Sequence, residues 1–256
     1  MAYDKGKQLN TFHLFAGAGG GILADLLLGH NPIGACEIEP YPREVLLQRQ
    51  QDGILPKFPI WDDICTLDGR PWRGTVSLLA GGFPCQDISS AGKGAGITGA
   101  RSGLWKEYAR IIDEMRPQFI FAENSPLLRT RGLGVVLEDL ASLGYDARWG
   151  IIGARDFGAP HKRDRMWVFA YPKGWRLQEE VEEQGLSRES GLRPTQQTGS
   201  HWSSPIKDGL LGMVPSEFIR VDDGMAHWVD RIKAVGNGQC PIVAANALKI
   251  LSEGLI

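Results

Sequence analysis

LNTFHLFAGAGGGILADLLLG, residues 9–29, is the stretch that decides the fold. Its first residues, 9–15, are mostly apolar and predict a short buried strand. A glycine cluster follows at 17–21, and the apolar run from Ile22 to Gly29 predicts a helix that ends at the glycine. A strand, a glycine turn and a helix in this order are typical of a cofactor-binding unit in a doubly wound α/β fold.

Strand-like and helix-like segments continue to alternate along the chain. Apolar runs suited to strands lie at 32–38, 76–82, 119–124, 147–154 and 166–172. Helical spacing of apolar residues is found at 43–50, 103–115, 133–144 and 241–251. Because this alternation implies a mostly parallel sheet with helices on both faces, we predict a doubly wound, Rossmann-like α/β fold. Functional groups are then expected on loops at the carboxyl ends of the strands.

Composition indicates one main domain and a small lobe. With 256 residues, of which 43% are hydrophobic, the chain can bury one large core. From Lys173 onward the sequence becomes polar and rich in Gln, Ser and Glu, which is typical of a segment with little core. We therefore predict a main, cofactor-binding domain over 1–172, a small lobe over 173–212 and a C-terminal segment over 213–256 that returns to the main domain.

Charge and cysteine content exclude several classes of protein. The net charge is −2, so any nucleic-acid surface must be local, and the segment 155–176 is basic enough to supply one. The same charges also suit an ordinary solvated face. None of the four cysteines lies in a CxxC pair, so we expect neither a metal site nor a disulfide framework. No apolar run suits a membrane span and no signal peptide is visible, so we expect no membrane contact and a cytoplasmic location.

The glycine turn does not fit the common nucleotide fingerprints. Ile22 stands where a nicotinamide-binding turn needs a third glycine, and the phosphate-binding pattern GxxxxGK[ST] is absent. Glu37 ends the second predicted strand and could accept hydrogen bonds from two ribose hydroxyls, while Asp63 could accept one from an adenine amino group. These groups suit a cofactor with a ribose but no pyrophosphate. The alternative is that the glycines only make tight turns and the acids are surface groups.

A nucleophile and an acid end two neighbouring predicted strands. Cys85, in GGFPCQ, could add to C6 of a pyrimidine and make C5 nucleophilic, if a carboxylic acid engages N3. Glu123 is the candidate acid, although a structural cysteine and a salt-bridging glutamate are the plainer alternatives. Arg163 and Arg165 alternate along a segment predicted to be extended, so both are expected to point the same way, one toward a pyrimidine O2 and one toward a phosphate.

Seven sequence blocks follow one another within about Thr11 to Val243. They are HLFAGAGG, CEIE, DDI, GGFPCQ, ENS, HKRDR and RIKAVGNGQCP. In this order they resemble the cytosine-5 DNA methyltransferase family in its bacterial and phage form. The resemblance implies a class I methyltransferase fold with S-adenosyl-L-methionine as the cofactor. It also implies methyl transfer to C5 of a cytosine flipped out of double-stranded DNA. We expect the protein to be a monomer.

The same resemblance assigns roles to individual residues. Cys85 would be the nucleophile and Glu123 would engage N3, while Arg165 would hold the base and Arg163 would support the loop or a phosphate. The cofactor pocket would be lined by Phe15, Ala18, Gly20, Glu37, Ile38, Asp63, Ile64, Pro84, Leu104, Asn237 and Gly238. A loop over 86–99 would close over the DNA. DNA contacts are expected from Gln86, Ser89, Lys93, Arg163, Arg193 and Trp202.

The chain also departs from the family pattern. His161 replaces a usual glutamine, and Ile38 replaces an aromatic residue that often stacks on adenine. The region available for target recognition, 173–212, is unusually small, so we predict a short or relaxed recognition sequence. Two alternatives remain open, an RNA (tRNA) cytosine-5 methyltransferase and a catalytically inactive DNA-binding relative. A nicotinamide-dependent dehydrogenase is disfavoured by Ile22.

Overall fold

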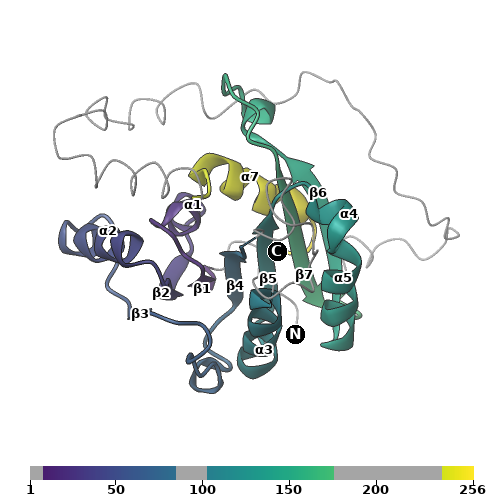
Figure 1. Ribbon diagram of the computed structural model, residues 1–256, viewed down its shortest axis with the longest axis horizontal. Helices are drawn as coiled ribbons and strands as arrows, with labels where there is room; N and C mark the ends of the chain where they lie inside the picture. The colour runs from purple at the N-terminus through teal and green to yellow at the C-terminus, as the bar shows by residue number, and fades with distance from the viewer. Residues whose placement is uncertain (1–7, 85–102, 176–237) are drawn as a thin grey trace, which may run out of the picture.

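A single twisted sheet organises the protein. The computed structural model describes residues 8–84, 103–175 and 238–256. These residues form a seven-stranded sheet in the order β3-β2-β1-β4-β5-β7-β6 (Figure 1). The strands are β1 (Asn10–Leu14), β2 (Asn31–Cys36), β3 (Ile60–Trp61), β4 (Leu78–Gly82), β5 (Phe119–Asn124), β6 (Tyr145–Ile152) and β7 (Arg165–Pro172). The first five strands pair in parallel, whereas β7 is antiparallel to both β5 and β6. The predicted α/β fold with a mostly parallel sheet is therefore confirmed.

Helices cover both faces of this sheet (Figure 1). They are α1 (Gly20–Leu27), α2 (Pro40–Gln51), α3 (Leu104–Met115), α4 (Leu128–Arg131), α5 (Leu133–Ser142) and α7 (Pro241–Leu251). The core on one face is formed with α3, α4 and α5, and it includes the fully buried Trp105 and Tyr108. On the other face, α7 and the α1 residue Ala24 pack over a stacked pair, Phe121 and Trp167, whose ring centroids lie 5.0 Å apart. No helix in the described parts of the chain is long and apolar enough to cross a membrane.

The sequence predicted most of these elements but missed the shortest. The helix α1 begins at Gly20, inside the glycine cluster, and β6 begins at Tyr145. The strand β3 and the helix α4 were not predicted, because two and four residues are too short to show a periodic pattern. The predicted lobe over 173–212 lies outside the described residues, except for its first three positions. The C-terminal helix α7 packs against β6 and β7.

The strand order reverses between β1 and β4. The chain proceeds from β1 outward through β2 to β3, and then returns to place β4 on the other side of β1. In open α/β sheets, ligands bind beyond the carboxyl ends of the strands at such a reversal. The turn after β1 and the segment after β4 therefore border the place where a ligand is expected to bind, which we call the crevice. The cofactor residues predicted on β1–β3 and the catalytic groups predicted on β4, β5 and β7 lie on its two sides.

Candidate active site

The turn after β1 adopts left-handed backbone conformations, which favour glycine. Phe15, Gly17 and Gly19 have φ angles of 52°, 53° and 88°, all in the left-handed region. Glu37, at the end of β2, fixes this turn through its carboxylate. The N–H of Gly17 donates to Oε2 at 2.6 Å, and the N–H of Glu39 donates to Oε1 at 2.9 Å. Each oxygen has a second lone pair, so Glu37 can still accept from a ligand hydroxyl.

The predicted adenine end of the pocket lies beyond β2 and β3. Ile38 follows Glu37 and is 61% exposed, while Ile64 is buried. The Asp63 carboxylate accepts a hydrogen bond from the N–H of Cys65 at 2.9 Å and so begins a tight turn. The structure thus gathers Phe15, Ala18, Gly20, Glu37, Ile38, Asp63 and Ile64 at the carboxyl ends of β1–β3. Leu104, at the start of α3, packs against the same core as Phe15.

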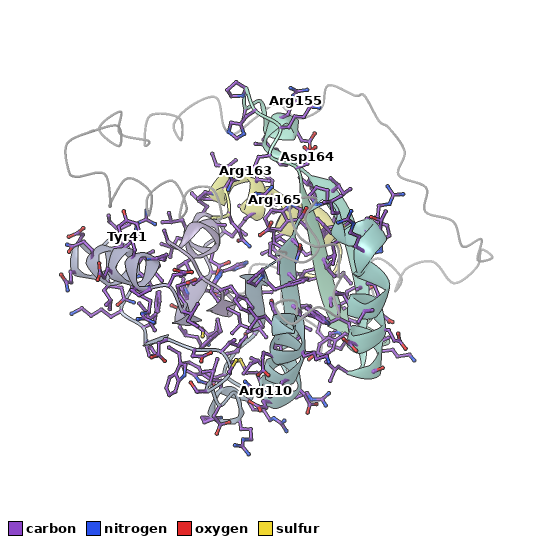
Figure 2. The ribbon with its side chains drawn as sticks, viewed as in Figure 1. Tyr41, Arg110, Arg155, Arg163, Asp164 and Arg165 are labelled. Carbon is purple, nitrogen blue, oxygen red and sulfur yellow. The ribbon has the colours of Figure 1, made fainter. Side chains whose placement is uncertain are left out.

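Arg110 on α3 holds the 63–69 turn in place, a role that the sequence did not suggest. Its guanidinium donates to the carbonyl oxygens of Ile64 at 2.6 Å and Leu67 at 3.0 Å. The same side chain forms ion pairs with Glu107 and Glu114 on its own helix. Figure 2 shows Arg110 on α3, well away from Arg163 and Arg165. Arg110 therefore supports the turn that carries Asp63 and Ile64, two of the residues predicted to bind the cofactor.

Glu123 and Arg165 form an ion pair on the other side of the crevice. Glu123, near the end of β5, is 8% exposed, and its Oε1 lies 2.9 Å from Nε of Arg165, the first residue of β7. Burial raises the pKa of the Glu123 carboxyl above its usual range, and the charge of Arg165 opposes this rise. The Arg165 side chain is 28% exposed, so the pair faces solvent on one side. A carboxyl with a raised pKa beside a partly open cation can donate a proton to a ring nitrogen and bind a carbonyl oxygen.

Arg163 has a different partner from Arg165. Its φ is 40°, so the prediction of an extended segment through Arg163 and Arg165 is wrong. Just before this turn the carbonyl of Lys162 accepts a hydrogen bond from the N–H of Ala154 at 2.8 Å, and β7 begins only at Arg165. The Arg163 guanidinium donates to the carbonyl oxygen of Gly238, next to α7. Figure 2 shows Arg163 and Arg165 close together beside this helix.

Several predicted site residues lie outside the described residues. They are Cys85, the loop over 86–99 with Gln86, Ser89 and Lys93, and the more distant Arg193, Trp202 and Asn237. Pro84, which immediately precedes the predicted nucleophile, follows Phe83 at the end of the segment after β4. Asn124 donates from Nδ2 to the carbonyl oxygen of Phe83 at 3.0 Å and so fixes the segment leading to Cys85 against β5. The sequence block ENS contains Asn124 but suggested no such contact.

A match to a protein-family model identifies the family of this chain. Residues 9–217 match the model described as C-5 cytosine-specific DNA methylase. The chain belongs to this family. Among curated methylases, it is 34% identical over 170 residues to the type II methyltransferase M2.BsuMI of Bacillus subtilis, a match that covers 63% of this chain and 42% of the relative. The type II methyltransferase M.DsaV of Dactylococcopsis salina is also 34% identical over 170 residues, with coverage of 64% and 46%.

Solved structures with methylase names share the fold. The S. pombe Dnmt2 methyltransferase superposes with a TM-score of 0.51 at 21% identity, covering 64% of this chain and 49% of that one. The Entamoeba histolytica methyltransferase EhMeth gives a TM-score of 0.54 at 18% identity, covering 66% and 55%. These similarities confirm the class I methyltransferase fold. The chain spans less than half the length of the two curated relatives named above.

Proposed function

We propose that this methylase transfers a methyl group from S-adenosyl-L-methionine to C5 of cytosine in double-stranded DNA. The observation that carries the proposal is the ion pair of the buried Glu123 on β5 with the partly exposed Arg165 on β7, beside the strand that leads to Pro84 and Cys85. The pairing of Gly82 with Glu123 across β4 and β5 supports a shared pocket for the nucleophile and the acid. Its similarity to type II methyltransferases supports a place in DNA modification, as in restriction-modification systems.

The proposed chemistry uses one thiol and one carboxyl. The Cys85 thiolate adds to C6 of the cytosine while Glu123 gives a proton or a hydrogen bond to N3, which makes C5 nucleophilic. Arg165 holds the base through O2 and keeps Glu123 in place. After C5 has been methylated and has lost its proton, Cys85 leaves C6 and the aromatic ring is restored. The cytosine must leave the DNA stack to reach these groups.

The cofactor side of the crevice fits S-adenosyl-L-methionine. Glu37 offers carboxylate oxygens for the ribose hydroxyls, and a Cβ added at Gly17 would meet no atom within 4 Å, so the turn leaves open space beside it. Asp63 and the exposed Ile38 lie at the predicted adenine end. When bound there, the cofactor supplies the methyl group. The free Cys36 and Cys65 suit the reducing cytoplasm that we propose as the location.

The DNA contacts and the small recognition lobe remain predictions. Gln86, Ser89 and Lys93 are expected to close over the DNA, with Arg193 and Trp202 among the contacts from the lobe. A short or relaxed recognition sequence is expected because a small lobe offers few base contacts. Mapping a strict site of six base pairs or more would contradict this prediction.

The proposed function is tested by bisulfite sequencing. The chain is expressed in cells without endogenous cytosine methylation, and cells carrying the empty vector serve as the control. Methylated cytosines that appear only with the protein would support the proposal and reveal the recognised sequence. Purified protein is assayed in parallel on duplex DNA and on tRNA. Methyl transfer to tRNA alone would favour the RNA methyltransferase, and transfer to neither would favour an inactive relative.

Replacing Arg110 with methionine is expected to weaken cofactor binding selectively. The 63–69 turn would lose two carbonyl anchors. The loss of one charged hydrogen bond already corresponds to about tenfold, so we expect KM for the cofactor to rise at least about tenfold with kcat nearly unchanged. Steady-state kinetics at varied cofactor concentration measures both constants. Arg70→Met is the matched control, because Arg70 lies beside the same turn and its pair with Asp68 is exposed, so that losing it should cost little. A fall in kcat at constant KM would contradict this role.

A further inference from the structure

Gln239 lies between the two halves of the crevice. It follows Gly238, whose carbonyl accepts from Arg163, and it precedes α7. Together with Arg163, Arg165 and Trp167, it lines the space next to the start of α7. Its side chain has no part in the cofactor binding and the chemistry proposed above. Its contacts reach both the glycine turn of the cofactor side and the carboxyl group of the catalytic side.

The first set of contacts joins Gln239 to the start of α1. A Cβ added at Gly20 would collide with the carbonyl oxygen of Gln239, so the two backbones touch directly. A Cβ at Gly21 would lie 2.6 Å from Oε1 of Gln239 and 3.1 Å from the ring of His13. At Gly20 a side chain would displace the Gln239 backbone, whereas at Gly21 it would push aside the flexible end of the Gln239 side chain. The backbone of Gln239 therefore packs against the start of α1, and this contact requires glycine at position 20.

The second contact joins Gln239 to Glu123. The Gln239 side-chain amide is hydrogen-bonded to the Glu123 carboxyl. Oε2 of Glu123 and Nε2 of Gln239 lie over the same residue, Gly82, where an added Cβ would collide with Oε2 and lie 3.4 Å from Nε2. Oε1 of Glu123 is already held by Arg165 at 2.9 Å. Oε1 therefore has its partner on β7, while Oε2 and the Gln239 amide nitrogen both lie next to Gly82.

We propose that Gln239 is a positioning residue that fixes the location of Glu123 relative to the cofactor turn. Its backbone packs against Gly20, and its amide nitrogen donates a hydrogen bond to Oε2 of Glu123. This inference rests on the proposed methyl transfer, in which Glu123 must meet N3 while the methyl group faces C5. A single side chain that touches both halves fixes the distance between them. Preorganisation of this kind lowers the cost of aligning the reacting groups.

The charged groups around Glu123 determine how Gln239 affects its titration. Arg165 on β7 and Arg163 before β7 face the carboxyl, and together with the Gln239 amide they oppose the rise in pKa that burial causes. On the neighbouring strand β4, the uncharged Gly82 pairs with Glu123. Removing the amide donor withdraws one group that favours the ionised carboxylate. Loss of Gln239 should therefore raise the pKa of Glu123 further.

The test compares Gln239→Met with the wild type and with a matched control. Gln50→Met removes an amide donor of the same kind from α2, where Gln50 donates to the carbonyl of Phe58 at 3.0 Å. The titration midpoint of Glu123 is followed by NMR of ¹³C-labelled glutamate carboxyls, assigned by the signal missing in Glu123→Gln. We expect the midpoint to move to higher pH in Gln239→Met only. At neutral pH we expect kcat to fall about tenfold, the size of one hydrogen bond to a charged group, with the cofactor KM nearly unchanged.

Two outcomes of this experiment are decisive. An unchanged midpoint in folded Gln239→Met would overturn the proposal. If Gln239→Met does not fold, Gln239→Glu is used instead, because it has nearly the same shape and adds a negative charge. It should raise the titration midpoint of Glu123 even more. An unchanged midpoint in this variant would also overturn the proposal. The NMR titration needs no turnover. A wild type that transfers no methyl group would therefore refute the proposed function separately, without deciding whether Gln239 holds Glu123.

Discussion

Replacing Glu123 with glutamine is expected to reduce methyl transfer about 10²- to 10⁴-fold, the usual contribution of a positioned acid or base. The amide has nearly the same shape and keeps an oxygen to accept from Arg165, but it cannot give a proton to N3 of the cytosine. Single-turnover methyl transfer to duplex DNA measures the loss. Cys85→Ser sets the floor of the assay, because it removes the proposed nucleophile altogether. Glu138→Gln, an exposed change on α5, is the neutral control.

The same substitution is expected to stabilise the folded protein at higher pH. Since burial raises the pKa of Glu123 in the folded state, the folded protein holds this proton over a pH range in which the unfolded chain has lost it. The wild-type free energy of unfolding therefore falls as pH rises from the ordinary glutamate value of about 4.3 to the raised pKa. Glutamine does not titrate, so the advantage of Glu123→Gln should grow across this window and then level off.

Denaturant unfolding at several pH values tests this second effect. A variant that is inactive but more stable than the wild type at alkaline pH would show that the buried carboxyl is kept for chemistry at a cost in stability. Equal loss of activity and stability would instead mean that Glu123 is mainly structural. Methyl transfer above one tenth of the wild-type rate would remove Glu123 from the proposed mechanism.

The fold could be predicted because its signals are local. The glycine turn after a buried strand, and the alternation of apolar runs with helical spacing, are properties of neighbouring residues. They were enough to predict a doubly wound sheet and to place Glu123 at the end of a strand. The antiparallel placement of β7 between β5 and β6 depends on side-by-side packing of distant segments. No pattern within either strand specifies this order.

The site was predicted less completely for the same reason. The sequence predicted that Glu123 and Arg165 share one site, because each belongs to a recognisable sequence block. The contacts of Gln239 and Arg110 involve backbone carbonyls and glycines of other segments. Because every residue has a carbonyl, the sequence does not show which residue provides such a contact. The turn at Arg163 lies beside a hydrogen bond between the distant Ala154 and Lys162, and it stands where an extended segment was expected. Side-chain chemistry was thus readable from sequence, whereas backbone anchoring was not.

Gly81→Ala is expected to destabilise the protein by about 3 kcal/mol, at the upper end of the usual cost of overpacking a core. Gly81 lies on the central strand β4, opposite Leu14 of β1, and a Cβ there would collide with the Leu14 carbonyl oxygen. The obstacle is backbone within a parallel sheet, so neither strand can yield without losing ladder hydrogen bonds. For a chain of this size, the loss corresponds to a fall in Tm of about 6–12 °C.

The matched control for this prediction is Gly134→Ala. Gly134 lies near the start of α5, and a Cβ there would meet no atom within 4 Å. Alanine should therefore stabilise the protein by about 0.5–1 kcal/mol, because glycine loses more conformational freedom on folding. Thermal and denaturant unfolding of both variants measures the two opposite shifts. If Gly81→Ala instead matched the wild type, the ends of β1 and β4 would have to be free to separate. The paired ends of β1 and β4 would then not be rigid enough to keep the cofactor turn aligned with Glu123.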